Sequence, residues 1–184
     1  MRLRVVALLA GFGVSLGLRV VVGGAAVAQS FSAGLVFAGC LLCLAVASGT
    51  RVPVSRSALL VGLAGVVLVC APVGLQHLLT FTPVYGTTGF ASWAAVVTVV
   101  ATAEEVFLRG TLYDAVEDLG GATAAIVVGA ACFALLHVPL YGWHVLPLDL
   151  AVGLVLGGLR QGAGTPAAPA VTHLGADLVG WFLR

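Results

Sequence analysis

Charged residues are scarce in this sequence, and lysine is missing altogether. Only 8% of the 184 residues are Asp, Glu, Lys or Arg, whereas 61% are hydrophobic and the mean hydropathy is +1.17. A soluble globular domain carries about 25% charged residues, so this composition excludes one and indicates a polytopic membrane protein. From this composition we expect the lipid bilayer as a partner and no nucleic acid.

The sequence also lacks a linker, a low-complexity tail and any convincing internal repeat, and it leaves no length for a soluble domain. Turn residues and charges interrupt the apolar sequence at intervals close to the ~20 residues that a membrane-spanning helix needs. We therefore expect a single transmembrane domain over residues 1-184, an all-α polytopic bundle of about seven helices. The expected helices cover residues 3-20, 31-49, 58-80, 91-113, 121-138, 146-160 and 167-183.

The start of the chain has two interpretations. Arg2 and Arg4, an apolar stretch and the small residues 26-28 imitate a secretory signal, in which case residues 1-28 are removed. Arg19 interrupts this apolar stretch, which favours a first membrane helix instead. The candidate site residues lie later in the chain and are the same in both cases.

Because lysine is missing, the arginines alone predict the orientation. With the N-terminus inside, the loops 80-90 and 139-146 lie outside and carry no arginine, and only Arg19 and Arg184 do not fit. Exclusive use of arginine and abundant Ala, Val and Gly suggest a bacterial, GC-rich origin, so we expect a multi-pass protein of the bacterial cytoplasmic membrane. The arginines expected on the cytoplasmic side are Arg2, Arg4, Arg51, Arg56 and Arg160.

Three ionisable residues interrupt the fourth expected helix. Each charge inside a span costs a few kcal/mol, so an intramembrane charge indicates a functional site. Glu105 and Arg109 are four positions apart, where helical side chains meet, and can neutralise each other. Glu104 points about 100° away around the helix and has no local cation. We expect Glu105 and Arg109 to support a site and Glu104 to face its cavity.

The next helix places Phe133 and His137 on one face. If the chain turns at Gly120-Gly121, Glu104 and His137 are equally far from the turn and reach similar depth in two antiparallel helices. A single histidine in an apolar helix is more often a packing residue than a catalyst. Its expected position opposite Glu104 indicates a shared cavity instead.

The last expected helix carries His173 and, four positions later, Asp177. By itself this pair is typical of a hydrogen bond that holds a bundle together. Together with Glu104 and His137, however, it completes a set that can hold a water molecule, deprotonate it and stabilise an oxyanion. Asp149, near the start of the sixth helix, is expected to reach the outer interface.

These motifs resemble those of the CAAX-protease and bacteriocin-processing (CPBP) family of intramembrane proteases. The resemblance covers residues 91-183, and the motifs follow the family's order on successive late helices. They are E-E-x-x-x-R from Glu104 to Arg109, F-x-x-x-H from Phe133 to His137, and H-x-x-x-[N/D] from His173 to Asp177.

The resemblance implies an intramembrane endopeptidase that cleaves a peptide or membrane-protein substrate. It implies that Glu104 is the general base on a water molecule held by His137, that His173 and Asp177 support the oxyanion, and that Glu105 and Arg109 shape the site. The family more typically has Asn where this chain has Asp177. An ionised aspartate would repel an oxyanion, so Asp177 is either protonated or orients His173.

Metal dependence stays open at the level of the sequence. Glu104, His137 and His173 would make a two-histidine, one-carboxylate zinc set with an open water position, and the family has been described as metalloproteases. The same three residues can work as a glutamate protease, and no H-E-x-x-H helix pins two ligands together. We expect no obligatory cofactor, with zinc as the alternative.

Two other functions compete with proteolysis. One is a small proton- or cation-coupled transporter, and the other is a catalytically silent immunity or scaffold protein on the same fold. Transporters often show two similar halves, whereas the ionisable residues of this chain cluster after residue 100. That distribution favours a single catalytic site.

Overall fold

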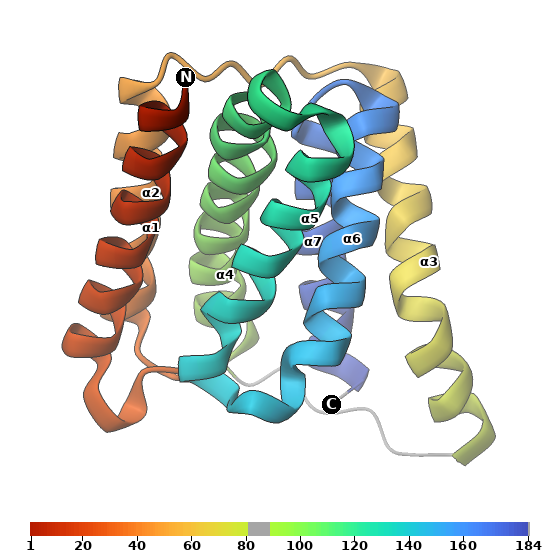
Figure 1. Cartoon of the computed structure of the whole chain (residues 1–184). Coiled ribbons are helices and arrows are strands. Elements are labelled where there is room, and N and C mark those ends of the chain that lie inside the picture. The colour runs from red at the N-terminus through yellow and green to blue at the C-terminus, as the bar shows by residue number, and fades with distance from the viewer. Residues whose placement is uncertain (81–88, 184) are drawn as a thin grey trace.

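The computed structural model describes residues 1–80 and 89–183, and in these ranges the chain is helical with no strand. The predicted all-α bundle is confirmed (Figure 1). Its α-helices are α1 (Arg2–Gly23), α2 (Phe31–Ala47), α3 (Arg56–Thr80), α4 (Phe90–Glu105), α5 (Tyr113–Tyr141), α6 (Leu146–Ala163) and α7 (Ala167–Leu183). The expected loop at 80-90, apart from its ends, and Arg184 lie outside the described residues.

The beginnings of three helices follow from hydroxyl side chains that cap them. The N–H of Ala33 donates to Ser30 at the start of α2, and the N–H of Ala58 donates to Ser55 at the start of α3. The hydroxyl of Thr165 accepts from the N–H of Ala167 at the start of α7. Each cap satisfies a backbone donor that the first helical turn leaves without a partner.

The expected helix end at residue 113 is wrong. The backbone stays helical after α4 through a π-helical stretch, Val106–Leu112, and continues as α5 until it breaks at Gly121. No glycine or proline lies between residues 111 and 119 to stop it earlier. Gly121 has φ 78° and ψ 173°, a conformation that is essentially restricted to glycine. The chain reverses its direction at this residue.

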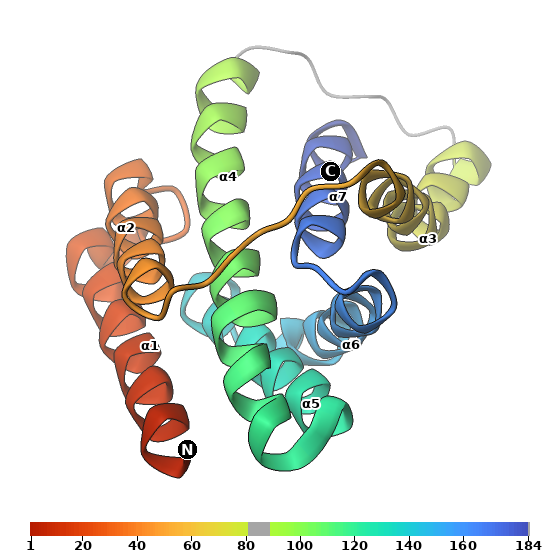
Figure 2. The same cartoon turned by 90° about the horizontal axis from the view of Figure 1, so that it is seen from above.

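Helix α4 lies in the middle of the bundle (Figure 2). In the view from above, α1 and α2 lie on one side of it and α3, α6 and α7 on the other. The main helix pairs are α3 with α7, α5 with α6, α1 with α2 and α2 with α4. The connection between α2 and α3 crosses over α4 on the side of the bundle where the N-terminus lies (Figures 1 and 2).

Small residues allow α5 and α6 to approach closely. A Cβ atom added to Gly153 would lie 2.8 Å from Cα of Ala130, and one added to Gly157 would lie 2.9 Å from Cγ2 of Ile126. This G-x-x-x-G spacing puts both glycines on the face of α6 that contacts α5, as in packed membrane helices.

The outer surface of the bundle is apolar, as a membrane protein requires. Leu3, Val21 and Leu60 are each at least two-thirds exposed. Three helical stretches of the described residues are long and apolar enough to cross a membrane, namely 2–26, 90–141 and 143–163, while 31–47 and 56–72 are shorter apolar helices. The exposed apolar side chains would contact lipid tails.

Candidate active site

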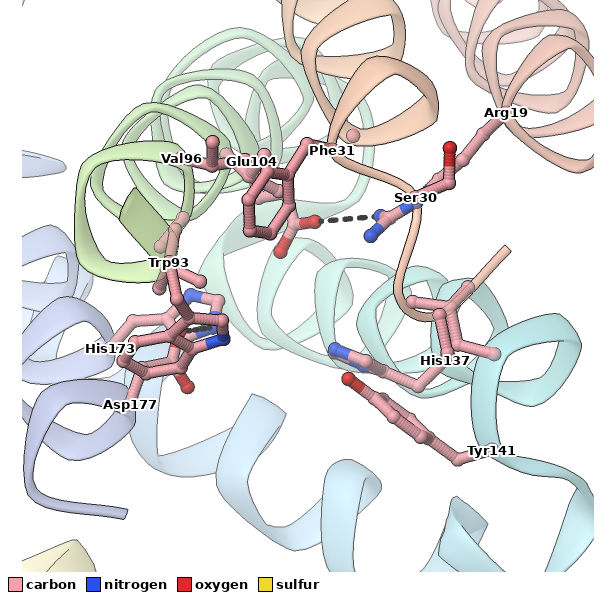
Figure 3. Close-up of a pocket in the computed structure, with 16 residues that line it drawn as sticks. Arg19, Ser30, Phe31, Trp93, Val96, Glu104, His137, Tyr141, His173 and Asp177 are labelled. Atoms are coloured by element: carbon pink, nitrogen blue, oxygen red, sulfur yellow. Dashed lines mark hydrogen bonds and ion pairs between the residues drawn. The ribbon is translucent and has the colours of Figure 1, made fainter. Parts of the chain in front are cut away.

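A cavity of about 150 Å³ inside the bundle brings the four main candidate residues together. Glu104 reaches it from α4, His137 from α5, and His173 and Asp177 from α7 (Figure 3). These residues come from three helices that are separated in sequence. The cavity is large enough for several water molecules, because each occupies about 30 Å³.

A second cavity, of about 260 Å³, adjoins the same residues from the side of α3 and α6. His137, Tyr141, His173 and Asp177 line both cavities, whereas Glu104 lines only the first and Asp149 only the second. The two histidines therefore lie between the first and the second cavity. This arrangement leaves open space on both sides of a substrate bond placed next to the histidines.

The first cavity extends to the end of the bundle opposite the N-terminus. Ala28 and Ser30 of the α1–α2 connection, Trp93 near the start of α4 and Tyr141 at the end of α5 line it. Figure 1 shows these helix ends together, on the side away from the N-terminus and the Gly121 turn.

Glu105 joins three helices beneath the first cavity. Its Oε1 atom accepts from Nη1 of Arg109 at 2.7 Å and from Nδ1 of His173 at 2.9 Å. Arg109 also donates from Nη2 to the carbonyl oxygen of Gly153 on α6, and its guanidinium lies 4.8 Å from the centre of the Phe133 ring. Glu105 and Arg109 are almost completely buried. The predicted Glu105–Arg109 pair is confirmed.

His137 is held by its own helix and by α6. Its Nδ1 atom lies 3.0 Å from the carbonyl oxygen of Phe133 and 3.6 Å from Oδ2 of Asp149. A carbonyl oxygen can only accept, so Nδ1 carries a proton, and in the neutral ring Nε2 keeps its lone pair. Asp149, expected near the outer interface with a role at the cavity as the alternative, is turned toward His137. Nε2 of His137 can therefore accept a hydrogen bond from a water molecule.

His173 lies between two carboxylates. While Nδ1 donates to Glu105, Nε2 is 3.6 Å from Oδ2 of Asp177, one turn further along α7. The edge of the Phe133 ring packs against the imidazole, with 5.1 Å between the ring centres. These contacts fix the orientation of the His173 ring and direct its Nε2 edge toward Asp177.

Arg19 is a site residue that sequence reasoning missed. Although Glu104 has no cation in its own helix, Nη1 of Arg19 on α1 lies 3.4 Å from its Oε1 atom (Figure 3). The Arg19 guanidinium also lies 4.9 Å from the centre of the Phe37 ring on α2. The available signal was an arginine within an apolar stretch, but residue spacing cannot identify a partner on another helix.

Comparison with protein families adds an independent observation. The type II CAAX prenyl endopeptidase Rce1-like family matches residues 86–179, half of the chain. The chain belongs to this family. It is the CPBP family that the three motifs resemble, and it is a family of proteases. Comparisons with curated proteins and with solved structures gave no match.

The match to the Rce1-like family separates the site into two parts. It includes Glu104, Glu105, Arg109, Phe133, His137, Asp149, His173 and Asp177. Arg19 lies in the part of the chain before the match, as do Ala28 and Ser30, which also line the cavity. The first two helices therefore complete a cavity whose other walls belong to the family-matching part.

The zinc set expected as an alternative stays a prediction. Within residues 1–80 and 89–183, no group of three His, Cys, Asp or Glu side chains is arranged to hold a metal ion. Nδ1 of His173 contacts Glu105, and Glu104 contacts Arg19. Glu104, His137 and His173 line the same cavity.

Proposed function

We propose that this protein is an intramembrane endopeptidase in which Glu104 activates a water molecule for attack on a peptide bond. The observation that carries this proposal is the position of Glu104. It is a buried carboxylate that lines an internal cavity together with His137 and His173, in a chain of a protease family.

Water activation requires two acceptors on one water molecule. In our proposal one water O–H donates to Glu104 and the other donates to Nε2 of His137, which leaves an oxygen lone pair for the substrate. Glu104 takes one proton as the water oxygen bonds to the carbonyl carbon, and the carbonyl π electrons move onto oxygen. When the C–N bond breaks, the proton on Glu104 passes to the leaving amine. General acid–base catalysis of this kind contributes about 10²–10⁴-fold.

His173 has a supporting part in this mechanism. Its Nε2 edge faces the substrate space beside Asp177, and Glu105 fixes the ring from the other side. We assign to His173 a contact with the substrate carbonyl oxygen and to Asp177 the orientation of the His173 ring. Glu105 and Arg109 position these groups, because both are buried beneath the cavity and make no contact with its space.

The substrate that fits this site is an extended peptide or a membrane-protein segment that can enter from the bilayer. Apolar side chains of α4, among them Val96, Val97 and Val100, line the first cavity next to Phe31 of α2. For a bacterial protein we propose leader peptides, bacteriocin precursors or membrane-protein fragments rather than prenylated CAAX proteins.

The test is turnover by the purified protein in detergent. Wild type is compared with Glu104→Gln, with His137→Gln and with Asp118→Asn, an exposed acidic residue near the Gly121 turn that serves as the control. Each is assayed on quenched fluorescent peptides with and without a farnesylated C-terminal CAAX sequence, and with and without a chelator. We expect Glu104→Gln and His137→Gln to lose at least 100-fold in kcat and the control to match wild type.

The other conditions of this experiment distinguish proteolysis by Glu104 from the alternative mechanisms, substrates and functions. Equal turnover by wild type and Glu104→Gln would contradict the proposal. Loss of wild-type activity in chelator would add a metal to the mechanism, and preference for the farnesylated peptide would reverse the substrate assignment. If wild type cleaves nothing, proton and cation flux through reconstituted vesicles tests the transporter hypothesis.

A further inference from the structure

We propose that Arg19 of α1 is a further catalytic residue, which stabilises the negative charge that develops on the substrate carbonyl oxygen. This inference rests on the proposed function, since it assumes water attack assisted by Glu104. It extends the site to a helix that lies outside the family-matching residues.

The first support is that Arg19 is a buried cation whose N–H donors are not all in use. Arg19 is only 8% exposed and lines the first cavity. Its Nη1 atom contacts Glu104, whereas its buried Nε atom has no hydrogen-bond partner among the described residues. Arginine stays charged under all ordinary conditions and carries five N–H donors. A buried donor without a partner is costly and needs an explanation, and an oxygen atom of a bound substrate would supply the missing acceptor.

The second support is the movement of charge during the reaction. Before the attack, Arg19 is paired with the carboxylate of Glu104 across 3.4 Å. When Glu104 takes the proton from water, it becomes neutral and Arg19 loses its anionic partner. In the same step, the carbonyl oxygen gains negative charge within the same cavity. The guanidinium can then interact with this oxygen while the charge inside the cavity stays balanced.

The third support is the composition of the cavity wall. Among the described residues that line the first cavity, Arg19 is the only arginine, and the carboxylates of Glu104 and Asp177 line it too. If Asp177 is ionised, it repels an oxyanion, so its presence raises the need for a permanent cation. A preorganised donor at a developing oxyanion contributes about 10²–10³ in kcat.

The experiment compares Arg19→Gln, Arg19→Lys and the double variant Arg19→Gln with Asp177→Asn. Arg51→Gln is the matched control, because Arg51 is exposed in the α2–α3 connection. For each variant we would measure kcat and KM on one peptide substrate, and the inhibition constant of a phosphonate analogue of that peptide. The analogue carries a tetrahedral anion where the substrate carries the scissile carbonyl group.

We expect Arg19→Gln to lower kcat about 100-fold, with KM changed less than threefold, and to weaken phosphonate binding by a similar factor. The double variant should recover at least tenfold of the lost kcat, because it also removes the repulsion from Asp177. If Arg19 had a purely structural role, its replacement would not selectively weaken phosphonate binding. The double variant would also not recover kcat.

Two results would overturn the inference while leaving the proposed function intact. One is an active wild type and an inactive Glu104→Gln, with Arg19→Gln within threefold of wild type in kcat. The other is unchanged phosphonate binding in a folded Arg19 variant. If Arg19→Gln does not fold, the same measurements are made on Arg19→Lys. This variant keeps the positive charge but lacks the planar, forked N–H donors of the guanidinium group. An inactive wild type would instead contradict the proposed function itself.

Discussion

His173 and Glu105 are 68 positions apart in the chain, and Nδ1 of His173 donates to Oε1 of Glu105 across 2.9 Å. This bond ties α7 to the end of α4 directly below the candidate cavity. Because Glu105 also holds Arg109, one carboxylate positions a candidate catalytic ring and balances a buried cation. Removing it should therefore affect folding and turnover together.

Glu105→Gln is expected to destabilise the protein by about 3–5 kcal/mol, because it leaves the charge of Arg109 buried without its anionic partner. The measurement is the thermal midpoint of the helical circular dichroism signal in detergent. Glu117→Gln is the control, since Glu117 is exposed. A midpoint for Glu105→Gln within about one degree of wild type would show that Arg109 is neutralised in another way.

Gly153→Ala is expected to destabilise the bundle by about 1–3 kcal/mol, since the new methyl group would overlap the backbone of Ala130 on α5. Gly158→Ala, on the same helix, is the matched control, because a Cβ atom there meets no atom within 4 Å. The control should be neutral or stabilising by about 0.5–1 kcal/mol, as expected for alanine in a helix. Equal unfolding midpoints for both variants would contradict the close α5–α6 contact.

The arginine distribution predicts which side of the membrane the cavity end at Ala28 and Ser30 faces, and with it the side from which a substrate approaches. With the N-terminus inside, the α1–α2 connection faces outward and the α2–α3 connection faces the cytoplasm. In a variant without the four native cysteines, we expect an impermeant thiol reagent to label Gln29→Cys in intact cells. Arg51→Cys should be labelled only after lysis. The opposite pattern would show that the cavity opens toward the cytoplasm.

The positions of the helices and of six candidate site residues were predictable because they depend on local periodicity. Apolar segment length gives the spans. Residues four positions apart share a helix face, which pairs Glu105 with Arg109 and His173 with Asp177. Equal distances from a turn bring Glu104 and His137 to one cavity. No step of this kind requires knowledge of how distant helices pack.

The remaining contacts depend on packing, which local patterns do not contain. Arg19 meets Glu104, Asp149 meets His137 and His173 meets Glu105 only because helices from different parts of the chain are neighbours. The expected end at residue 113 failed for a different reason. A charge marks where a membrane helix leaves the bilayer, but it does not interrupt the helical backbone, which continues to Gly121.

The position of Arg19 on α1 changes what processing of the N-terminus would mean. Phe12 of α1 stacks on Phe107 with 5.9 Å between the ring centres, and Leu8 is buried in the same core. A signal peptidase cutting after Ala28 would therefore remove part of this core together with the cation beside Glu104. The intact mass of the protein isolated from membranes thus reports whether the chain has kept Arg19 beside Glu104.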